Sequence, residues 1–175
     1  MKVLTLLRHA KSGWDDPALR DFDRPLNARG RRAARTIGAE MRRLGLRFDT
    51  VIASPARRVI ETLHEVEQTF GRLDPQWDER LYLAPPEMLL EVAQGSDESV
   101  ERLLLVGHNP GLEELVLRSA SGSALRDAAA VKYPTATLAE LTFDATSWRQ
   151  LAAGAATLSR FIRPRDLDPD LGPED

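Results

Sequence analysis

Val3-Leu4-Thr5-Leu6-Leu7-Arg8-His9-Ala10-Lys11, near the start of the chain, joins an apolar run to a basic segment that carries an imidazole. Residues 2–7 are predicted to form a buried β-strand, because this short run is almost entirely apolar. The strand delivers an arginine and a histidine to the point where it ends. An imidazole beside a guanidinium suits the handling of phosphate groups. The fold and the chemistry are both expected to start from this strand.

A second histidine follows a second apolar run. His108 comes directly after Leu103-Leu104-Leu105-Val106-Gly107, and the chain has only three histidines. Taken alone, a histidine at a strand end is more often structural than catalytic. Two histidines in the same context favour a shared chemical role. His64, inside a predicted helix, lacks that context and is expected to be structural.

The rest of the chain alternates predicted strands with predicted helices. Strands are expected near residues 50–53, 102–106, 137–143 and 157–162, with a brief extended piece at 80–83. Helices are expected from about 28 to 44, from 55 to 70, from 85 to 93, and after Asn109-Pro110. Ser54 and Asn109 each precede a proline and are predicted to be helix N-caps. This order predicts an α/β fold, a three-layer α/β/α sandwich with a mostly parallel central sheet, whose ligands bind beyond the carboxyl ends of the strands.

Length and composition fit one globular domain. The chain has 175 residues, of which 42% are hydrophobic and 29% charged, so a sizeable core is expected. The domain is predicted to span residues 1–167. Residues 168–175, rich in proline and acidic side chains, are predicted to form a mobile tail.

Charge and special residue types exclude several classes of protein. The net charge of −3 gives no overall attraction to nucleic acid, and the arginines of the helix at 28–44 are interpreted as a solvated helix face. The absence of cysteine excludes a disulfide scaffold. No metal site is predicted, because neither His9 nor His108 has a nearby ligand at zinc spacing. No apolar run approaches the roughly 20 residues that span a bilayer, so a cytoplasmic protein without membrane attachment is expected.

Three distant segments each bring polar residues to the end of a predicted strand. They are Arg8-His9, Ser54-Pro55-Ala56-Arg57-Arg58 and Gly107-His108-Asn109-Pro110-Gly111. In a parallel sheet these ends converge at one edge. Helix N-termini at that edge would add positive dipole ends, and arginines would clamp oxygens bidentately. The combined pocket is predicted to bind a dianion such as a phosphoryl group.

These segments resemble, in order, the R-H-G/A, S-x-x-x-R-x-x-x-T and G-H motifs of the histidine phosphatase superfamily, whose fold is called phosphoglycerate mutase-like. The second motif is represented here by Ser54-Pro55-Ala56-Arg57-Arg58-Val59-Ile60-Glu61-Thr62. Within the superfamily, the small size and the stretches 8–14, 23–26 and 161–164 resemble the SixA-type phosphohistidine phosphatases. The resemblance covers residues 1 to about 167.

The resemblance implies roles for individual residues. His9 resembles the nucleophile that becomes phosphorylated, Arg8 and Arg58 resemble the phosphate clamps, and His108 resembles the histidine that contacts the transferring group. Arg57 lies one residue outside the motif register. Catalysis of this kind requires no cofactor or metal.

Two further residues are candidates for the site. Ser12, in the stretch after the nucleophile, is a possible phosphate ligand, and Glu79 resembles the position where mutase-like relatives carry a general acid. An imidazole leaving group has a pKa near 6.5 and needs less acid assistance than an alkoxide. A weak or absent acid would therefore be tolerated in a phosphohistidine phosphatase.

The sequence leads to one principal function and leaves two alternatives. The principal one is a metal-independent phosphatase acting on phosphohistidine of a signalling or phosphocarrier protein. A small-molecule phosphomonoesterase is favoured if Glu79 is a working acid. A non-catalytic phosphohistidine-binding module is the third reading, and the presence of His9, Arg8, Arg58 and His108 argues against it. The sequence does not specify an oligomeric state.

Overall fold

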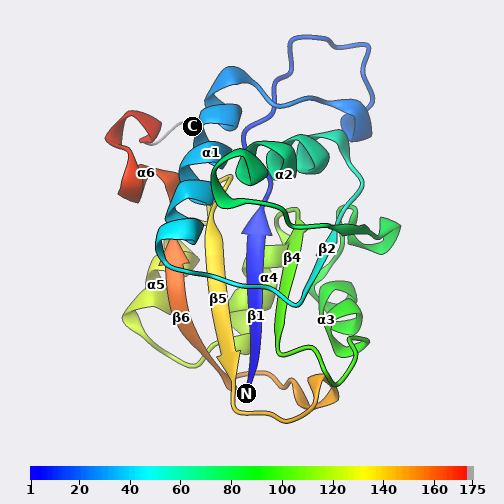
Figure 1. The fold of residues 1–175 in the computed structure, drawn as a ribbon, viewed down its shortest axis with the longest axis vertical. Helices are drawn as coiled ribbons and strands as arrows, with labels where there is room; N and C mark the ends of the chain where they lie inside the picture. Colours follow the sequence, from blue (N-terminus) through cyan, green and yellow to red (C-terminus); the bar gives the residue numbers. More distant parts are fainter. Residues whose placement is uncertain (173–175) are drawn as a thin grey trace.

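In the computed structural model, which describes residues 1–172, six strands form one sheet in the order β3-β2-β4-β1-β5-β6 (Figure 1). The strands are β1 (Lys2–Arg8), β2 (Thr50–Ala53), β3 (Gln76–Trp77), β4 (Arg102–Gly107), β5 (Leu138–Phe143) and β6 (Ala156–Ile162). β1 pairs in parallel with β4, and β2 pairs in parallel with both β3 and β4. Only β5 runs against its neighbours β1 and β6. The predicted mostly parallel sheet is confirmed.

Helices cover both faces of the sheet. The α-helices are α1 (Ala28–Arg43), α2 (Arg57–Phe70), α3 (Pro86–Gln94), α4 (Gly111–Ser119), α5 (Ala124–Val131) and α6 (Pro164–Leu167). The 3-10 helices are η1 (Asp21–Asp23), η2 (Glu79–Leu81), η3 (Trp148–Gln150) and η4 (Pro169–Leu171). In Figure 1, α1 and α2 lie in front of the sheet and α4 lies behind it. The predicted three-layer sandwich is confirmed.

The two central strands are buried on both faces, which explains their unbroken apolar sequence. In β1, Leu4 and Leu6 pack into the core beneath α3 and α4, whereas Leu7 packs into the core beneath α1 and α2. In β4, Leu103 and Leu104 divide between the same two cores. The alternation of successive side chains thus fixes β1 and β4 at the centre of the molecule. Their carboxyl ends lie side by side.

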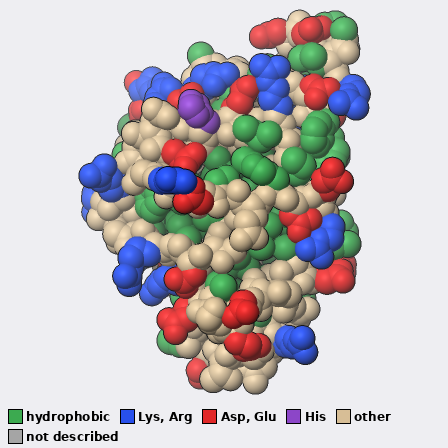
Figure 2. Space-filling model, turned by 45° about the vertical axis from the view of Figure 1, so that its right-hand side comes forward, with side chains coloured by type: hydrophobic (Ala, Val, Ile, Leu, Met, Phe, Trp, Pro, Cys, Tyr) green, Lys and Arg blue, Asp and Glu red, His purple; other side chains and the backbone are tan. Residues whose placement is uncertain are grey.

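Four arginines of α1 pair with carboxylates: Arg31, Arg32, Arg35 and Arg43. Arg31 contacts Glu61 at 2.9 Å and Glu65 at 3.3 Å, and Arg35 contacts Glu65 at 2.6 Å. These ion pairs join α1 to α2. On the face shown in Figure 2, basic and acidic side chains are likewise interspersed, without one large region of a single sign.

The predicted start of α2 is wrong by two residues. α2 begins at Arg57, and its N-cap position is held by Ala56 rather than by Ser54. The Ser54 hydroxyl accepts a hydrogen bond from the Ala56 amide and lies 2.8 Å from a ring nitrogen of His108. Ser54 therefore contacts His108 in the site and does not cap α2.

Other element predictions need correction as well. The extended piece expected at 80–83 is instead the 3-10 helix η2, which Asp78 caps by accepting a hydrogen bond from the Arg80 amide. β3 and α5 were not predicted. α4 begins at Gly111, while the side chain of Asn109 accepts a hydrogen bond from the Glu113 amide at 3.2 Å.

The end of the chain lies against α1 as far as it is described. Asp168 accepts a hydrogen bond from Arg32 at 2.6 Å, and Leu171 is buried. Residues 173–175 of the predicted mobile tail lie outside the described residues, and its mobility stays a prediction, as does the single domain over residues 1–167. Within residues 1–172, no helix combines the length and the apolar character needed to cross a membrane.

Candidate active site

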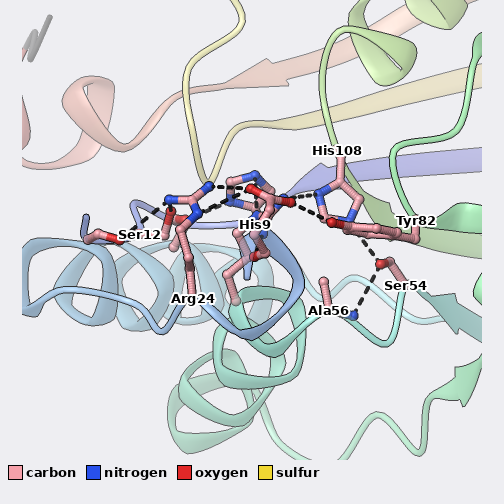
Figure 3. Close-up of polar contacts among 11 residues, drawn as sticks. His9, Ser12, Arg24, Ser54, Ala56, Tyr82 and His108 are labelled. Carbon is pink, nitrogen blue, oxygen red and sulfur yellow. Dashed lines mark hydrogen bonds and ion pairs between the residues drawn. The ribbon is translucent and has the colours of Figure 1, made fainter. Parts of the chain in front are cut away.

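The carboxyl ends of β1 and β4 bring the two strand-end histidines together. Arg8 is in register with Gly107, and the His9 amide donates a hydrogen bond to the Gly107 carbonyl at 3.0 Å. His108 follows directly on β4. The ring centroids of His9 and His108 are 5.2 Å apart. The predicted convergence of these segments is therefore present, as Figure 3 shows.

The ring of His9 is held as one neutral tautomer. Its Nδ1 lies 2.7 Å from the Ala10 carbonyl oxygen, and because a carbonyl can only accept, Nδ1 carries the proton. Nε2 faces the Arg58 guanidinium, whose Nε donates to it at 3.4 Å. Burial lowers the pKa of His9 well below its usual value, and the positive charges of Arg58 and Arg8 act in the same direction. Nε2 is left as an unprotonated nitrogen.

His108 is also neutral. Arg58 Nη2 donates to Nδ1 of His108 at 3.3 Å, so Nε2 carries the proton and donates it to the Ser54 hydroxyl at 2.8 Å. Burial, followed by the positive charge of Arg58, lowers the pKa of His108 to about 3. Tyr82 packs edge-on against this ring with a centroid distance of 5.4 Å. The orientation of His108 is therefore fixed from two sides.

Arg58, in the first turn of α2, connects the two histidines. Its side chain is 3% exposed, and besides His9 and His108 it contacts Asp21, donating to the backbone carbonyl at 2.7 Å and to the carboxylate at 3.0 Å. A buried guanidinium with this many partners has one defined position. The neighbouring Arg57 is half exposed and pairs with Glu61 at 2.8 Å.

Three residues of the site were missed by the sequence reasoning: Asp21, Arg24 and Tyr82. The Asp21 carboxylate accepts hydrogen bonds from Tyr82 Oη at 2.6 Å, from Arg58, and from Arg24 at 3.0 Å. Partial burial raises the pKa of Asp21, but these hydrogen bonds and the charge of Arg58 outweigh it and lower the pKa to about 2. Arg24 also donates to Ser12 at 2.6 Å. Asp21 is therefore an ionised carboxylate that contacts both Arg58 and Arg24.

The sequence gives little indication that Asp21, Arg24 and Tyr82 belong to the site. Arg24 lies in the stretch 23–26 that resembles SixA-type sequences, but nothing in that stretch marks a role. The loop between β1 and α1 has no periodicity from which its path could be read. Figure 1 shows this loop rising beyond the carboxyl end of β1 and returning to α1.

A cavity of about 340 Å³ opens over His9. Its lining residues are Arg8, His9, Lys11, Ser12, Trp14, Asp21, Arg24, Arg58, Leu83, His108, Asn109 and Thr135. Arg8 donates from Nη1 to the Tyr133 carbonyl at 2.8 Å, and its buried Nε has no hydrogen-bond partner within residues 1–172. Trp14 is 74% exposed and stacks on the Arg24 guanidinium at 3.5 Å. The cavity therefore combines several donors with one neutral imidazole nitrogen.

The predicted residues divide between those inside this cavity and those outside it. His9, Arg8, Arg58, His108 and Ser12 line it. Glu79 is exposed on η2 and is not among the lining residues. The ring of His64 is exposed on α2, away from this lining. Within residues 1–172, no cluster of three or more His, Asp or Glu side chains could hold a metal ion.

Comparison with known proteins gives relatives along most of the chain. Residues 4–82 match the family described as the histidine phosphatase superfamily (branch 1). An uncharacterised protein of Mycobacterium tuberculosis is 36% identical over 163 residues, which cover 91% of this chain and 100% of the relative. An uncharacterised chloroplastic protein of Arabidopsis thaliana is 28% identical over 86% of this chain and 70% of its own length.

Solved structures have the same fold. The putative phosphohistidine phosphatase SixA from Agrobacterium tumefaciens is 30% identical, with a TM-score of 0.79 over 93% of this chain and 98% of the other. A phosphoserine phosphatase mutant from Entamoeba histolytica is 14% identical, with a TM-score of 0.64 over 95% of this chain and 100% of the other. The latter similarity concerns the fold alone.

Proposed function

Because this chain belongs to the histidine phosphatase superfamily and is of the SixA type, we propose that it is a cytoplasmic, metal-independent phosphatase that hydrolyses phosphohistidine on a signalling or phosphocarrier protein. Phosphatase activity follows from the family. Phosphoryl transfer to His9 is supported by one observation above all: Nε2 of His9 is unprotonated and faces a cavity lined by Arg8, Arg24 and Arg58. The narrower substrate is favoured because neither Asp21, which lines the cavity, nor the exposed Glu79 is suited to act as a general acid. The 30% identical relative named as a putative phosphohistidine phosphatase supports it further.

In the proposed first step, Nε2 of His9 attacks the phosphorus atom of the substrate. A new P–N bond forms to His9, while the P–N bond to the substrate imidazole breaks and its electron pair returns to that imidazole. The proton on Nδ1 of His9 stays hydrogen-bonded to the Ala10 carbonyl. That carbonyl keeps the attacking nitrogen free of a proton and stabilises the positive charge that develops on the ring.

In the proposed second step, water attacks the phosphohistidine at position 9. The P–N bond to His9 breaks, inorganic phosphate leaves, and the neutral ring is restored. Negative charge on the three phosphoryl oxygens would be stabilised in both steps by Arg8 and Arg58, and by His108 once the negative charge of the bound phosphoryl group favours a second proton on its ring. Arg8 supports this assignment because its Nε is a buried donor that a phosphoryl oxygen could satisfy.

The leaving group distinguishes this function from that of a small-molecule phosphomonoesterase. Alkoxide leaving groups need a general acid, and the candidate Glu79 is exposed and outside the cavity lining. Asp21 lines the cavity, but a pKa of about 2 leaves it ionised at neutral pH. Neither carboxyl is thus suited to donate a proton there. An imidazole leaving group, with a pKa near 6.5, can accept its own proton from solvent.

The test compares purified wild-type protein with His9→Ala on a phosphohistidine protein and on sugar phosphates, with and without EDTA. Wild-type protein is expected to release phosphate from the phosphohistidine protein much faster than from the sugar phosphates, and EDTA is expected to have no effect. His9→Ala should be inactive. Rapid acid-free quenching should trap a phosphoenzyme that is labile to acid.

Two results would contradict this function. Full activity of His9→Ala without an acid-labile phosphoenzyme would remove the nucleophile assignment. Preference for sugar phosphates would favour the phosphomonoesterase instead. The exposed His64 provides the matched control, since His64→Ala removes an imidazole from α2 outside the cavity and should leave turnover unchanged.

A further inference from the structure

The Asp21 carboxylate bridges two of the arginines that line the catalytic cavity. Its Oδ1 accepts hydrogen bonds from Nε and Nη2 of Arg24 at 3.1 and 3.0 Å. Its Oδ2 accepts one from Nη2 of Arg58 at 3.0 Å and one from Tyr82 Oη at 2.6 Å. The backbone carbonyl of Asp21 accepts a further hydrogen bond from Nη1 of Arg58 at 2.7 Å. A single residue therefore engages donors of both guanidinium groups.

These donors are of the kind that a phosphoryl group requires, because arginine binds carboxylate and phosphate oxygens through the same fork of N–H groups. In Arg58, Nε donates to His9 and Nη2 donates to His108 as well as to Asp21. In Arg24, both Nε and Nη2 donate to Asp21. An oxyanion that binds both arginines must therefore exchange hydrogen bonds with Asp21.

The carboxylate also acts on a bound phosphoryl group through its charge. Asp21 lines the cavity and is partly exposed, whereas the side chains of Arg24 and Arg58 are buried. A pKa of about 2 leaves Asp21 ionised at neutral pH. Two anions in one partly enclosed space repel each other. Asp21 thus opposes anion binding both by engaging donors and by repulsion.

From these contacts we propose that Asp21 is an internal anion that competes with the phosphoryl group for Arg58 and Arg24 and so lowers the affinity of the cavity for inorganic phosphate. A cavity lined by Arg8, Arg24 and Arg58 would otherwise retain a dianionic product, and slow product release limits turnover in many enzymes. This inference rests on the proposed function and deepens it, because phosphate is the product of that reaction. Asp21 acts through the two arginines and transfers no proton.

A purely supporting role for Asp21 predicts the opposite effect on phosphate binding. If the carboxylate only held Arg58 in position, its removal would leave the guanidinium less ordered and would weaken the binding of oxyanions. Competition predicts tighter binding, since donors are released and a negative charge is lost. The direction of the change in Kd therefore separates the two roles.

The experiment measures the Kd of inorganic phosphate and of vanadate by titration calorimetry, for wild-type protein and for Asp21→Asn. The substitution keeps the shape of the side chain and removes its charge. Kd of phosphate is expected to be about tenfold lower in Asp21→Asn, the size of effect of one hydrogen bond to a charged group. Asp21→Ser, a smaller neutral side chain, takes its place if Asp21→Asn lacks the wild-type circular dichroism spectrum.

The matched control is Asp23→Asn. Asp23 lies in the same 3-10 helix, η1, pairs with the exposed Arg20 at 2.8 Å and is not among the lining residues of the cavity. The control removes the same charge without releasing Arg58 or Arg24, and Kd should stay within about twofold of the wild-type value. Unchanged or weaker phosphate binding in Asp21→Asn, equal tightening in both variants, or no measurable binding in any form would overturn the inference.

Failure of the proposed function is distinguishable from failure of this inference, because phosphate binding needs no turnover. If phosphohistidine peptides are not hydrolysed, the proposed function is wrong, and the phosphate titration still decides the role of Asp21. If the peptides are hydrolysed but Kd does not fall in Asp21→Asn, only the inference is wrong.

Discussion

Arg57 and Arg58 are sequence neighbours with opposite surroundings. Successive residues of a helix point about 100° apart, so α2 directs Arg58 into the site and leaves Arg57 beside Glu61 at the surface. A burial difference of this kind cannot be read from two adjacent arginines. The motif register distinguishes them, because only Arg58 falls on its arginine position.

Arg58→Ala is expected to lower kcat by roughly 10²- to 10³-fold, because removal of one preorganised donor to a developing oxyanion has an effect of that size. Steady-state kinetics on a phosphohistidine peptide measures it. Arg57→Ala, the same change one residue earlier, should keep kcat within about twofold, the size of effect left by losing one exposed ion pair. Equal effects of the two substitutions would remove Arg58 from the clamp, provided that both variants keep the wild-type circular dichroism spectrum.

The strand-end residues were predictable because strands carry a periodic signal, whereas Asp21 and Arg24 were not. Both reach the cavity from a loop whose path depends on contacts with distant elements, such as that of Asp21 with Tyr82. Ser54 was assigned to a helix cap from the Ser-Pro pattern, but the ring of His108, from another strand, takes its hydroxyl. Local rules fail where a distant partner competes for the same atom.

At the scale of elements, the first turn of α1 packs closely against the start of the β1–α1 loop, which lines the catalytic cavity. A Cβ atom on Gly30 would lie 2.1 Å from the Lys11 carbonyl oxygen, which also accepts a hydrogen bond from the Asn27 amide at 3.1 Å. Only glycine allows the first turn of α1 to approach this closely. The helix start therefore positions the loop two residues after His9.

Gly30→Ala is expected to destabilise the protein by about 1–3 kcal/mol through overpacking and to lower kcat, because Lys11 and the adjoining site must shift. Helix propensity alone predicts the opposite sign, a gain of about 1 kcal/mol, so urea unfolding decides between the two. Gly95→Ala is the control. Its Cβ would meet its nearest neighbour at an ordinary 3.5 Å, and stability and activity should be retained.

For the whole molecule, burial of two neutral histidines couples stability to pH. In the folded state burial holds the pKa of His9 well below its usual value and that of His108 at about 3, whereas in the unfolded chain both are near 6.5. The unfolded state therefore binds more protons as the pH falls below about 6.5. Stability is expected to decrease from there toward pH 3, and Asp21 adds to the loss at the acid end.

The measurement is the free energy of unfolding in urea between pH 7 and pH 4. Each buried histidine contributes a slope of up to about 1.4 kcal/mol per pH unit, so His108→Gln should give a shallower dependence than wild-type protein. His64→Gln, which changes an exposed ring, should leave the slope as it is. An unchanged slope in His108→Gln would show that His108 is not the neutral buried group described above.

The alternating order of strands and helices predicted the architecture, because both follow from the burial of apolar side chains on two faces of one sheet. The alternation of strands and helices along the chain does not specify the order of the strands within the sheet. β4 inserts between β1 and β2, and that insertion, which depends on long-range pairing, is what brings His108 beside His9.

Trp14 lines the catalytic cavity, so its fluorescence can report the binding of an oxyanion there. Its indole stacks on the Arg24 guanidinium at 3.5 Å and is 74% exposed, while Trp148 is fully buried and Trp77 lies on β3. An oxyanion that draws Arg24 into the cavity would change the charge against the indole, and with it the emission of Trp14. Titration with vanadate should shift the fluorescence of wild-type protein and of Trp77→Phe but not of Trp14→Phe. The chain would then carry its own fluorophore for cavity occupancy, readable without turnover.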